Sequence, residues 1–473
     1  MNTFQVAEHK MLSVQGHEFV FLPADKAVFE IYKDLQELIQ HLDQAGPQKE
    51  EEIHAALPGM YADKKELFQT LVQRHILVPV SSSSPTPQAC HRLPDNIPVN
   101  TLVLHVTDAC NLACRYCYYL EDRADLRTDR SMNPAVIRHS IDFLLDHSGN
   151  LEKINLVFFG GEPLLNFKCI REAVDYAQQR AFAVGKEVQF SITTNATLLN
   201  AEYIDFLQEK AFTVSVSVDG FEEIHDTWRP FPDGSPSYRM IIPKVRKLLQ
   251  RAAKPVVARV TLVERPELVP EILEHLLQIG FTEVGFAPVT SGNSDYQLTD
   301  QDMDVLLEQF QVISNRFVDH VQKHKLLGFS NLIDLLVSFH HNELKSYPCG
   351  AGLGLFAVDS QGDFYPCQRF TGYNDFWMGD VFQGLHSGKV NAFRQGTPIY
   401  QKEECRTCWV RSICAGGCYN EAYIREGSHL LPNIHYCEWI KQWTQIGLET
   451  YCHLALSCPD FLDMLSRSRG HVV

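Results

Sequence analysis

Short apolar runs alternate with helical patterns through the middle of the chain. Between the runs, apolar residues recur with a helical period, as in Pro134–His147, Cys169–Val184 and Ala201–Gln208. The runs themselves are Leu102–Val106, Ile154–Phe159, Val188–Thr193, Val214–Val218, Val256–Val263 and Glu283–Pro288. This alternation predicts parallel βαβ units, and near-continuous apolar strands are typical of a sheet buried on both faces. The pattern leaves open whether the sheet stays flat or curls into a partial barrel.

The first 80 residues follow a different pattern. Lys10–Val14 and Glu18–Leu22 flank Gln15 and Gly16, which predicts a β-hairpin. Ala27–Leu42 has apolar residues at a helical period and predicts one helix. Two shorter helices and a closing strand are predicted at Lys49–Leu57, Ala62–Arg74 and Ile76–Val80. This order indicates a small winged-helix-like module over residues 1–80.

Changes in composition mark the other boundaries. A Ser- and Pro-rich stretch within residues 81–97 is typical of a linker. The α/β pattern occupies residues 98–330 and ends with a helical pattern at Asp302–Lys323. Gly, Pro and Cys become dense over 345–440, which favours a domain organised by bound ligands. A closing helix is predicted at Glu438–Leu456, and residues 441–473 form the C-terminal helix and tail.

Composition narrows the function classes. The 473 residues are 45% apolar and carry a net charge of −16, which disfavours sequence-independent binding of nucleic acid. The sequence has no run of 18 apolar residues and no secretory signal at Met1–Phe4, so we expect no membrane span and a cytoplasmic location. In a reducing compartment, 14 cysteines indicate metal ligands or catalysts rather than disulfides.

Cys110, Cys114 and Cys117 form a Cx3Cx2C triplet directly after the first predicted strand. Three thiolates in one loop can each bind one iron of a [4Fe–4S] cube and leave the fourth iron without a protein ligand. An open metal position lets a substrate or cofactor coordinate. The alternative is a structural zinc site, but zinc prefers four ligands and this spacing supplies three.

The triplet, with Tyr116 and Tyr118 on either side of Cys117, resembles the signature of radical S-adenosylmethionine (radical SAM) enzymes. Phe159–Pro163 (FGGEP) resembles the GGEP segment of the same family, in which glycine carbonyls and the Glu carboxylate hold the amino group of S-adenosylmethionine. The resemblance implies a partial (βα)6 TIM-like barrel. It also implies catalysis by a 5′-deoxyadenosyl radical that takes a hydrogen atom from substrate.

Carried over to this sequence, the resemblance implies which residues bind the cofactor. Those residues are Tyr116, Gly160, Gly161, Glu162, Asn195, Ser217 and Arg229. Most of them end predicted strands, where ligands bind in parallel sheets. For the polar residues, a role as a turn or cap is the alternative.

Seven further cysteines occur in an order that resembles that of SPASM domains. Proteins with such a domain carry two auxiliary [4Fe–4S] clusters. By this resemblance one cluster is held by Cys405, Cys408, Cys414 and Cys437, and the other by Cys349, Cys367, Cys418 and an unidentified fourth ligand. With the triplet, three clusters are expected. Zinc is the alternative, because CxxC pairs are common zinc ligands. The remaining cysteines, expected to be inert buried thiols, are Cys90, Cys169, Cys452 and Cys458.

The segments around these cysteines resemble peptide maturases that form thioether crosslinks, such as the SCIFF-peptide and quinohemoprotein amine dehydrogenase types. This resemblance implies Cys-to-Asp/Glu crosslinks in a peptide whose leader binds residues 1–80, a RiPP recognition element, by strand addition. A dimerisation module is the alternative for that region. A flavodoxin or ferredoxin would supply electrons.

Other chemistries occur on the same scaffold. Sulfatase-type oxidation of Ser or Cys uses an Asp directly after the cysteine that matches Cys367, and here Gln368 cannot act as a base. Cyclophane formation through C–C or ether bonds is a further alternative. A non-catalytic iron–sulfur electron carrier or scaffold would not need the GGEP segment.

Overall fold

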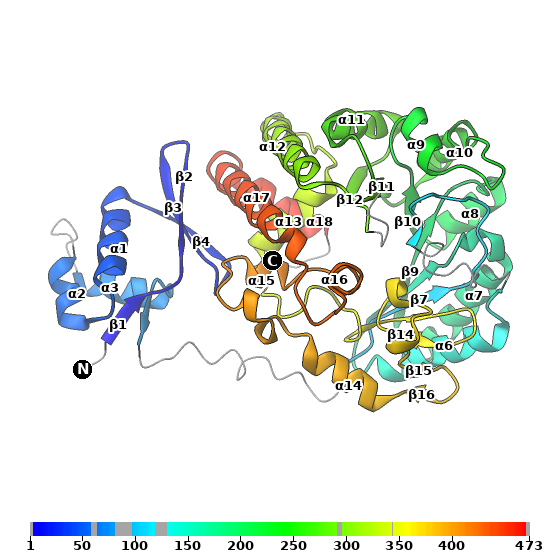
Figure 1. Ribbon diagram of the computed structural model, residues 1–473, viewed down its shortest axis with the longest axis horizontal. Helices are drawn as coiled ribbons and strands as arrows, with labels where there is room; N and C mark the ends of the chain where they lie inside the picture. The colour runs from blue at the N-terminus through cyan, green and yellow to red at the C-terminus, as the bar shows by residue number, and fades with distance from the viewer. Residues whose placement is uncertain are drawn as a thin grey trace.

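Six parallel strands form the centre of the computed structural model, which describes residues 3–57, 64–80, 97–118, 130–290, 296–342 and 344–469 (Figure 1). The strands are β7 (Thr101–His105), β8 (Lys153–Phe159), β9 (Glu187–Thr194), β10 (Thr213–Ser217), β11 (Val256–Leu262) and β12 (Glu283–Pro288). Each predicted apolar run forms one of them, with ends that differ by at most one residue. The α/β class and the parallel sheet are therefore confirmed.

The sheet runs in the order β12-β11-β10-β9-β8-β7 and continues through β13 (Leu355–Val358) and β14 (Phe364–Tyr365). Neighbouring strands from β12 to β13 are parallel, and only β14 is antiparallel to its neighbour. In register, His105 lies opposite Phe159 and Ser217 lies opposite Arg259. The carboxyl ends of the strands therefore align along one edge, where a site can form.

Helices follow the strands as predicted. They are α6 (Pro134–His147), α7 (Phe167–Ala183), α8 (Ala201–Glu209), α9 (Glu222–Trp228), α10 (Tyr238–Arg251) and α11 (Val269–Ile279). The sequence determines where α6 begins, because Pro134 occupies the first helical position and the Asn133 side chain accepts hydrogen bonds from two backbone N–H groups. The helices bury apolar faces against strands whose alternating side chains, such as Leu156 and Phe158, are fully buried.

The N-terminal region contains two small sheets. One has the order β2 (Lys10–Val14), β3 (His17–Leu22) and β4 (Ala27–Ile31); the other has the order β5 (Gln48–Lys49), β1 (Thr3–Val6) and β6 (Leu77–Pro79). Three helices accompany them, α1 (Lys33–Ala45), α2 (Glu50–Ala56) and α3 (Lys64–Gln73). The predicted hairpin is present as β2 and β3.

One helix of the N-terminal prediction begins too early, because α1 covers only the later part of the predicted range. Residues predicted as the first turns of a helix over 27–42 form β4, which pairs antiparallel with β3. Val28 and Ile31 stand three apart and fit a helical period, but Val28, Phe29 and Ile31 are also strand-favouring residue types. Pairing with β3 decides between the two, and the helix begins only after Tyr32.

The N-terminal region packs against the C-terminal half of the chain. Lys26 is buried and donates to the Ser338 hydroxyl at 2.7 Å. Arg411 forms an ion pair with Glu8 at 2.5 Å. Figure 1 shows this sheet beside the cysteine-rich segment and the C-terminal helices. The winged-helix description itself remains a prediction.

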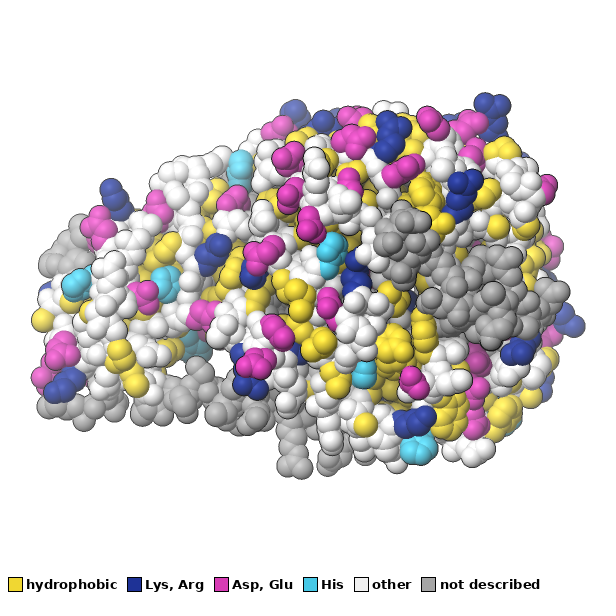
Figure 2. All heavy atoms as spheres, in the orientation of Figure 1, with side chains coloured by type: hydrophobic (Ala, Val, Ile, Leu, Met, Phe, Trp, Pro, Cys, Tyr) yellow, Lys and Arg dark blue, Asp and Glu magenta, His cyan; other side chains and the backbone are white. Residues whose placement is uncertain are grey.

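The C-terminal half adds α12 (Asp300–Gln322), α13 (Ser330–His340), α17 (Cys437–Ser457) and α18 (Pro459–Ser468), with α18 in the predicted tail. α12 and α17 pack through Phe310 and Trp443, whose ring centroids lie 4.9 Å apart. Among the described residues, no helix combines the length and hydrophobicity that a membrane span requires. On the face drawn in Figure 2, acidic and basic side chains are interspersed.

Candidate active site

A cavity of about 230 Å³ lies at the carboxyl ends of the strands. It is lined by all ten residues predicted to form the cofactor site: Cys110, Cys114, Tyr116, Cys117, Gly160, Gly161, Glu162, Asn195, Ser217 and Arg229. The cavity also contacts Phe159, the last residue of β8, and Ala287 on β12. β12 is at one end of the six strands, and β8 is next to the other end. Since residues of distant strands share one cavity, the sheet curls around it.

Gly160 and Gly161 pack directly against the start of the cysteine loop. A Cβ on Gly160 would lie 2.2 Å from the Thr107 carbonyl oxygen, and one on Gly161 would lie 2.1 Å from that of Ala109. Gly160 also has φ of +135°, a conformation that favours glycine. The resemblance accounted for these glycines by the approach of a ligand. The structure shows that the cysteine loop itself requires them.

We expect Gly161→Ala to destabilise the fold by about 1–3 kcal/mol, because the new methyl group must displace backbone rather than a mobile side chain. The displaced backbone adjoins Cys110, so iron bound after anaerobic reconstitution should fall as well. Thermal unfolding and iron analysis measure the two effects. Gly388→Ala, within helix α14 (Ser387–Gly396) and close only to the His386 side chain, is the matched control. Equal behaviour of the two variants would contradict the packing argument.

Glu162 is buried, and its carboxylate joins the ends of β8 and β9. It accepts hydrogen bonds from the Thr194 hydroxyl at 2.7 Å, the Asn195 backbone N–H at 2.7 Å and the Leu164 N–H at 3.1 Å. Burial raises the pKa of Glu162 to about 7, although these donors oppose the shift. The carboxylate of Glu162 therefore links the ends of β8 and β9. A ligand ammonium that bound it would share its oxygens with these protein donors.

Asp219, after β10, does not itself line the cavity but holds two residues that do. Its Oδ2 accepts from the Tyr116 hydroxyl at 2.5 Å and from Arg229 Nε at 2.8 Å, while Oδ1 accepts from the Thr261 N–H at 3.0 Å. All of the Asp219 side chain is buried. The Arg229 charge offsets the Asp219 charge, so Asp219 holds Tyr116 and Arg229 in place beside the cysteine loop.

His225 is hydrogen-bonded to the backbone of Asp219 and, through Ser237, to that of Arg229. Its Nδ1 accepts from the Asp219 N–H at 3.3 Å, so Nε2 carries the proton and donates to Ser237 Oγ at 3.0 Å. Ser237 in turn donates to the Arg229 carbonyl at 2.7 Å. This chain of bonds uses the neutral imidazole, and burial lowers the pKa of His225 to about 4.

The lowered pKa predicts acid sensitivity. The unfolded chain binds a proton at this histidine below pH 6.5, whereas the folded chain does so only near pH 4. Stability is therefore fully present above 6.5 and is lost as the pH falls towards 4, by up to about 3 kcal/mol. Denaturant unfolding across this window should show a smaller loss in His225→Gln. Exposed His41→Gln is the control. An undiminished loss in His225→Gln would refute the assignment.

The three thiols of the triplet are suited to a cluster rather than to free thiolate chemistry. Burial raises the pKa of Cys110 to about 12 and that of Cys114 to about 11. A bound metal deprotonates a coordinating thiol outright. Asn195 Nδ2 lies 3.9 Å from the Cys110 sulfur and Arg229 Nη1 lies 3.8 Å from the Cys114 sulfur. These donors are placed to stabilise a negatively charged cluster.

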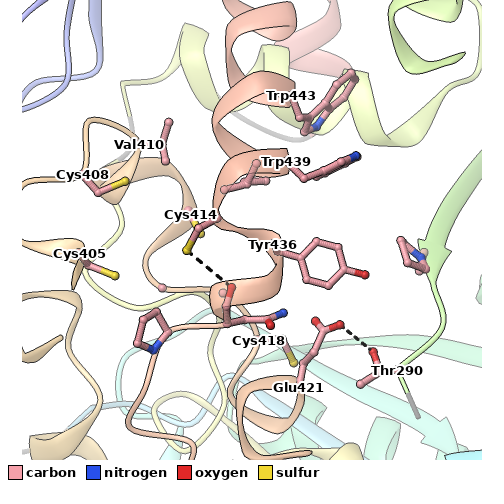
Figure 3. A pocket seen from close by; sticks show the side chains of 18 of the residues that line it. Thr290, Cys405, Cys408, Val410, Cys414, Cys418, Glu421, Tyr436, Trp439 and Trp443 are labelled. Carbon is pink, nitrogen blue, oxygen red and sulfur yellow. Dashed lines mark hydrogen bonds between the residues drawn. The ribbon is translucent and has the colours of Figure 1, made fainter. Parts of the chain in front are cut away.

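A second cavity, of about 410 Å³, adjoins the first and contains most of the C-terminal cysteines. Figure 3 shows the thiols of its loops on one side and Tyr436, Trp439 and Trp443 of the α17 region on the other. Five cysteines line it: Cys405, Cys408, Cys414, Cys418 and Cys437. The first, second, third and last of these form the set expected to hold one auxiliary cluster, and this donor set fits such a cluster.

Cys418 also adjoins the other expected set. Cys349 and Cys367 interact electrostatically with Cys418 and with each other, so the structure brings this trio together. In the part of the chain that the structure describes, no group of three His, Cys, Asp or Glu side chains is arranged to hold a single metal ion. A cube spaces its thiolates farther apart, because each thiolate binds a different iron.

The other described cysteines line neither of the two cavities. Cys169 in α7 and Cys452 in α17 are buried, as expected, and Cys458 is only partly buried. Cys90 lies outside the described residues. All thirteen cysteines in the described ranges are free thiols, with no disulfide between them.

The segment that supplies most of the first cavity is similar to known sequences. Residues 104–244, from β7 to α10, match the model of the Radical SAM superfamily. An uncharacterized protein of Methanocaldococcus jannaschii is 39% identical over 137 residues, which cover 29% of this chain and 44% of that protein. A serine-type anaerobic sulfatase-maturating enzyme of Klebsiella aerogenes is 25% identical over 337 residues, covering 68% of this chain and 80% of that enzyme.

Solved structures share the fold well beyond that segment. Native anSMEcpe with bound AdoMet and Cp18Cys peptide matches 76% of this chain and 99% of its own, with a TM-score of 0.65 and 20% identity. Streptococcus suis SuiB bound to precursor peptide SuiA matches 93% of this chain and 100% of its own, with a TM-score of 0.51 and 16% identity. The chain therefore has the α/β radical SAM fold with its parallel sheet.

Proposed function

We propose that this protein is a radical SAM enzyme that forms intrapeptide thioether crosslinks between Cys and Asp or Glu. One observation carries the proposal: a cavity lined by the cysteine triplet and the Gly160–Glu162 segment opens onto a second cavity lined by five cysteines. An electron carrier needs cysteines but needs neither a second cofactor pocket nor space for a substrate between two metal sites.

The residues of the first cavity have distinct tasks. Cys110, Cys114 and Cys117 would hold a cube with one open iron, and Gly160–Glu162 would face the methionine end of S-adenosylmethionine. Asn195, Ser217 and Tyr116 line the same cavity and would orient the rest of the cofactor. When bound, the cube and S-adenosylmethionine supply a radical that removes a hydrogen atom from substrate. The enclosed cavity positions the reacting C–H bond and excludes water.

The second cavity accounts for the remaining electron. After hydrogen abstraction, a bond between the substrate sulfur and the carbon radical releases one electron, and the thiol proton leaves. An auxiliary cluster held by Cys405, Cys408, Cys414 and Cys437 would accept that electron. An external one-electron donor such as a flavodoxin or ferredoxin would reduce the triplet cube.

The N-terminal region would hold the leader of the peptide. β2 and β4 are the edge strands of their sheet, and an edge strand offers unpaired backbone groups to an added strand. The likeness to SuiB bound to a precursor peptide extends over 93% of this chain, so it includes at least part of this region. Both facts support a peptide substrate without identifying it.

Sulfatase-type oxidation of Ser or Cys is the second candidate. Its support is the similarity to named sulfatase-maturating enzymes of Klebsiella and Clostridium. Against it, Gln368 occupies the position after Cys367 where those enzymes are expected to carry an aspartate base. Gln368 is not among the residues that line either cavity.

Anaerobically reconstituted protein tests the proposal when it is incubated with dithionite, S-adenosylmethionine and a candidate peptide rich in Cys and acidic residues. We expect 5′-deoxyadenosine and a product lighter by two hydrogen atoms per crosslink, with the sulfur joined to an acidic residue in tandem mass spectra. Loss of hydrogen at a Ser or Cys without a crosslink would favour the sulfatase-type reaction. No 5′-deoxyadenosine from fully loaded protein would refute both.

A further inference from the structure

The two cavities meet at a narrow region that we call the neck. It is made of the residues that line both cavities: Ala287 and Pro288 at the end of β12, Thr290, and Arg369. Three of these present small or uncharged groups. A substrate that reaches from the first cavity to the second must therefore pass the guanidinium of Arg369.

Arg369 differs from the other arginines of these cavities. Arg229 pairs with Asp219 at 2.8 Å, and Arg411 pairs with Glu8 at 2.5 Å. Arg369 forms no ion pair with an Asp or Glu anywhere in the described ranges, and its guanidinium instead stacks over the Tyr118 ring at 5.5 Å from the ring centroid. An arginine remains charged in any protein environment. Its electrostatic partners include Glu421, Cys418 and Cys367, but no Asp or Glu of the described ranges is in ion-pair contact with it.

The nearest acidic side chain of the second cavity already has partners. Glu421 accepts a hydrogen bond from the Thr290 hydroxyl at 3.1 Å, as Figure 3 shows, and lies 3.7 Å from Arg425 Nε. The neck region thus combines two guanidinium groups, Arg369 and Arg425, with one carboxylate. Because Glu421 is already held by Thr290 and Arg425, it leaves the guanidinium N–H donors of Arg369 to a carboxylate from outside the protein.

We propose that Arg369 binds the side-chain carboxylate of the substrate's Asp or Glu. A guanidinium can hold a carboxylate through two parallel hydrogen bonds, which fixes its orientation as well as its position. Held in the neck, the carboxylate would place the neighbouring C–H group towards the first cavity and leave the second cavity to the cysteine. This assignment rests on the proposed function for its class of substrate, and it explains why an acidic residue would be the acceptor.

A competing role for Arg369 is support of the auxiliary cluster alone, since Cys418 and Cys367 are among its electrostatic neighbours. The two roles differ in what they require of a ligand. Cluster support is indifferent to the substrate side chain, whereas carboxylate binding distinguishes Asp from Asn, which has nearly the same shape and no charge.

Equilibrium dialysis of anaerobic holoenzyme tests the assignment with two short peptides, each carrying a tritiated acetyl group and a C-terminal amide. Both contain one Cys, and they differ only in an Asp or an Asn, so the Asp side chain is the sole carboxylate. We expect the Asp peptide to bind about tenfold more tightly, a preference that should vanish in Arg369→Gln and persist in Arg316→Gln, at an exposed arginine that lines neither cavity. No preference in the wild type up to millimolar peptide, or equal loss in Arg316→Gln, would overturn the assignment.

Iron content is measured on every variant. If Arg369→Gln loses iron, Cys418→Ala decides between the two roles, because it removes a ligand of the same cluster and keeps Arg369. A retained preference for Asp in Cys418→Ala supports direct binding, and its loss there overturns it. Formation of 5′-deoxyadenosine in the same wild-type preparation is a separate readout. A preference for Asp without that product would leave the carboxylate site intact while refuting the proposed chemistry.

Discussion

Cys114→Ala should lose reductive cleavage of S-adenosylmethionine by more than about a thousandfold, equivalent to ~4 kcal/mol of transition-state stabilisation. Two remaining thiolates cannot hold a cube that presents its open iron to the cofactor. Arg229 would also lose the sulfur that lies 3.8 Å from its Nη1. The rate of 5′-deoxyadenosine formation under dithionite, followed by chromatography, measures the effect.

Auxiliary clusters should survive this change, because their cysteines line a separate cavity. Visible absorption and iron content of Cys114→Ala should therefore fall by the share of one cube. Cys169→Ala is the matched control: Cys169 is a buried thiol in α7 that lines neither cavity, and its loss should leave cleavage unchanged. Cleavage that continues in Cys114→Ala would rule out the triplet as the cofactor site.

Cys437→Ala should separate cofactor cleavage from peptide modification. Cys437 begins α17 and lines the second cavity, so its loss removes a ligand of the cluster expected to take the second electron. We expect crosslinked product to fall by more than about a hundredfold, or ~3 kcal/mol, while 5′-deoxyadenosine continues to form without product. Mass spectrometry of the peptide and chromatography of the nucleoside measure the two yields in one reaction.

Cys452→Ala is the control for this second variant, because Cys452 is buried in the same helix and contacts neither cavity. It should keep both yields near those of the wild type. Equal loss of both yields in Cys437→Ala would show that the two cavities do not act as separate metal sites. Unchanged crosslinking would exclude the auxiliary cluster as the electron acceptor.

Sequence periodicity sufficed for the central sheet, because strands buried on both faces and amphipathic helices leave strong and different patterns. It failed at Ala27–Ile31, where an apolar spacing of three suits a helix and the pairing with β3 decides otherwise. That pairing is a contact between segments, and no local pattern records it.

In the candidate site too, some residues could be predicted from local sequence patterns and others depend on contacts between distant segments. Spacing alone indicated the cysteine triplet as a candidate metal site, whereas the division of the other cysteines into two sets came from the resemblance. The structure brings the three cysteines of the triplet together in the first cavity. Asp219 and the neck residue Arg369 could not be assigned their places, because each depends on contacts between distant segments. The roles of Gly160 and Gly161 in packing against the cysteine loop likewise emerge only from the fold.

Electron–nuclear double resonance on the reduced, anaerobic holoenzyme tests the central claim most directly, with S-adenosylmethionine labelled at its amino nitrogen and carboxylate oxygen. The Cys114→Ala spectrum, subtracted from that of the wild type, isolates the triplet cube. We predict hyperfine coupling from both labels to that cube. A spectrum that shows no coupling and does not change when the nucleotide is added would contradict the account.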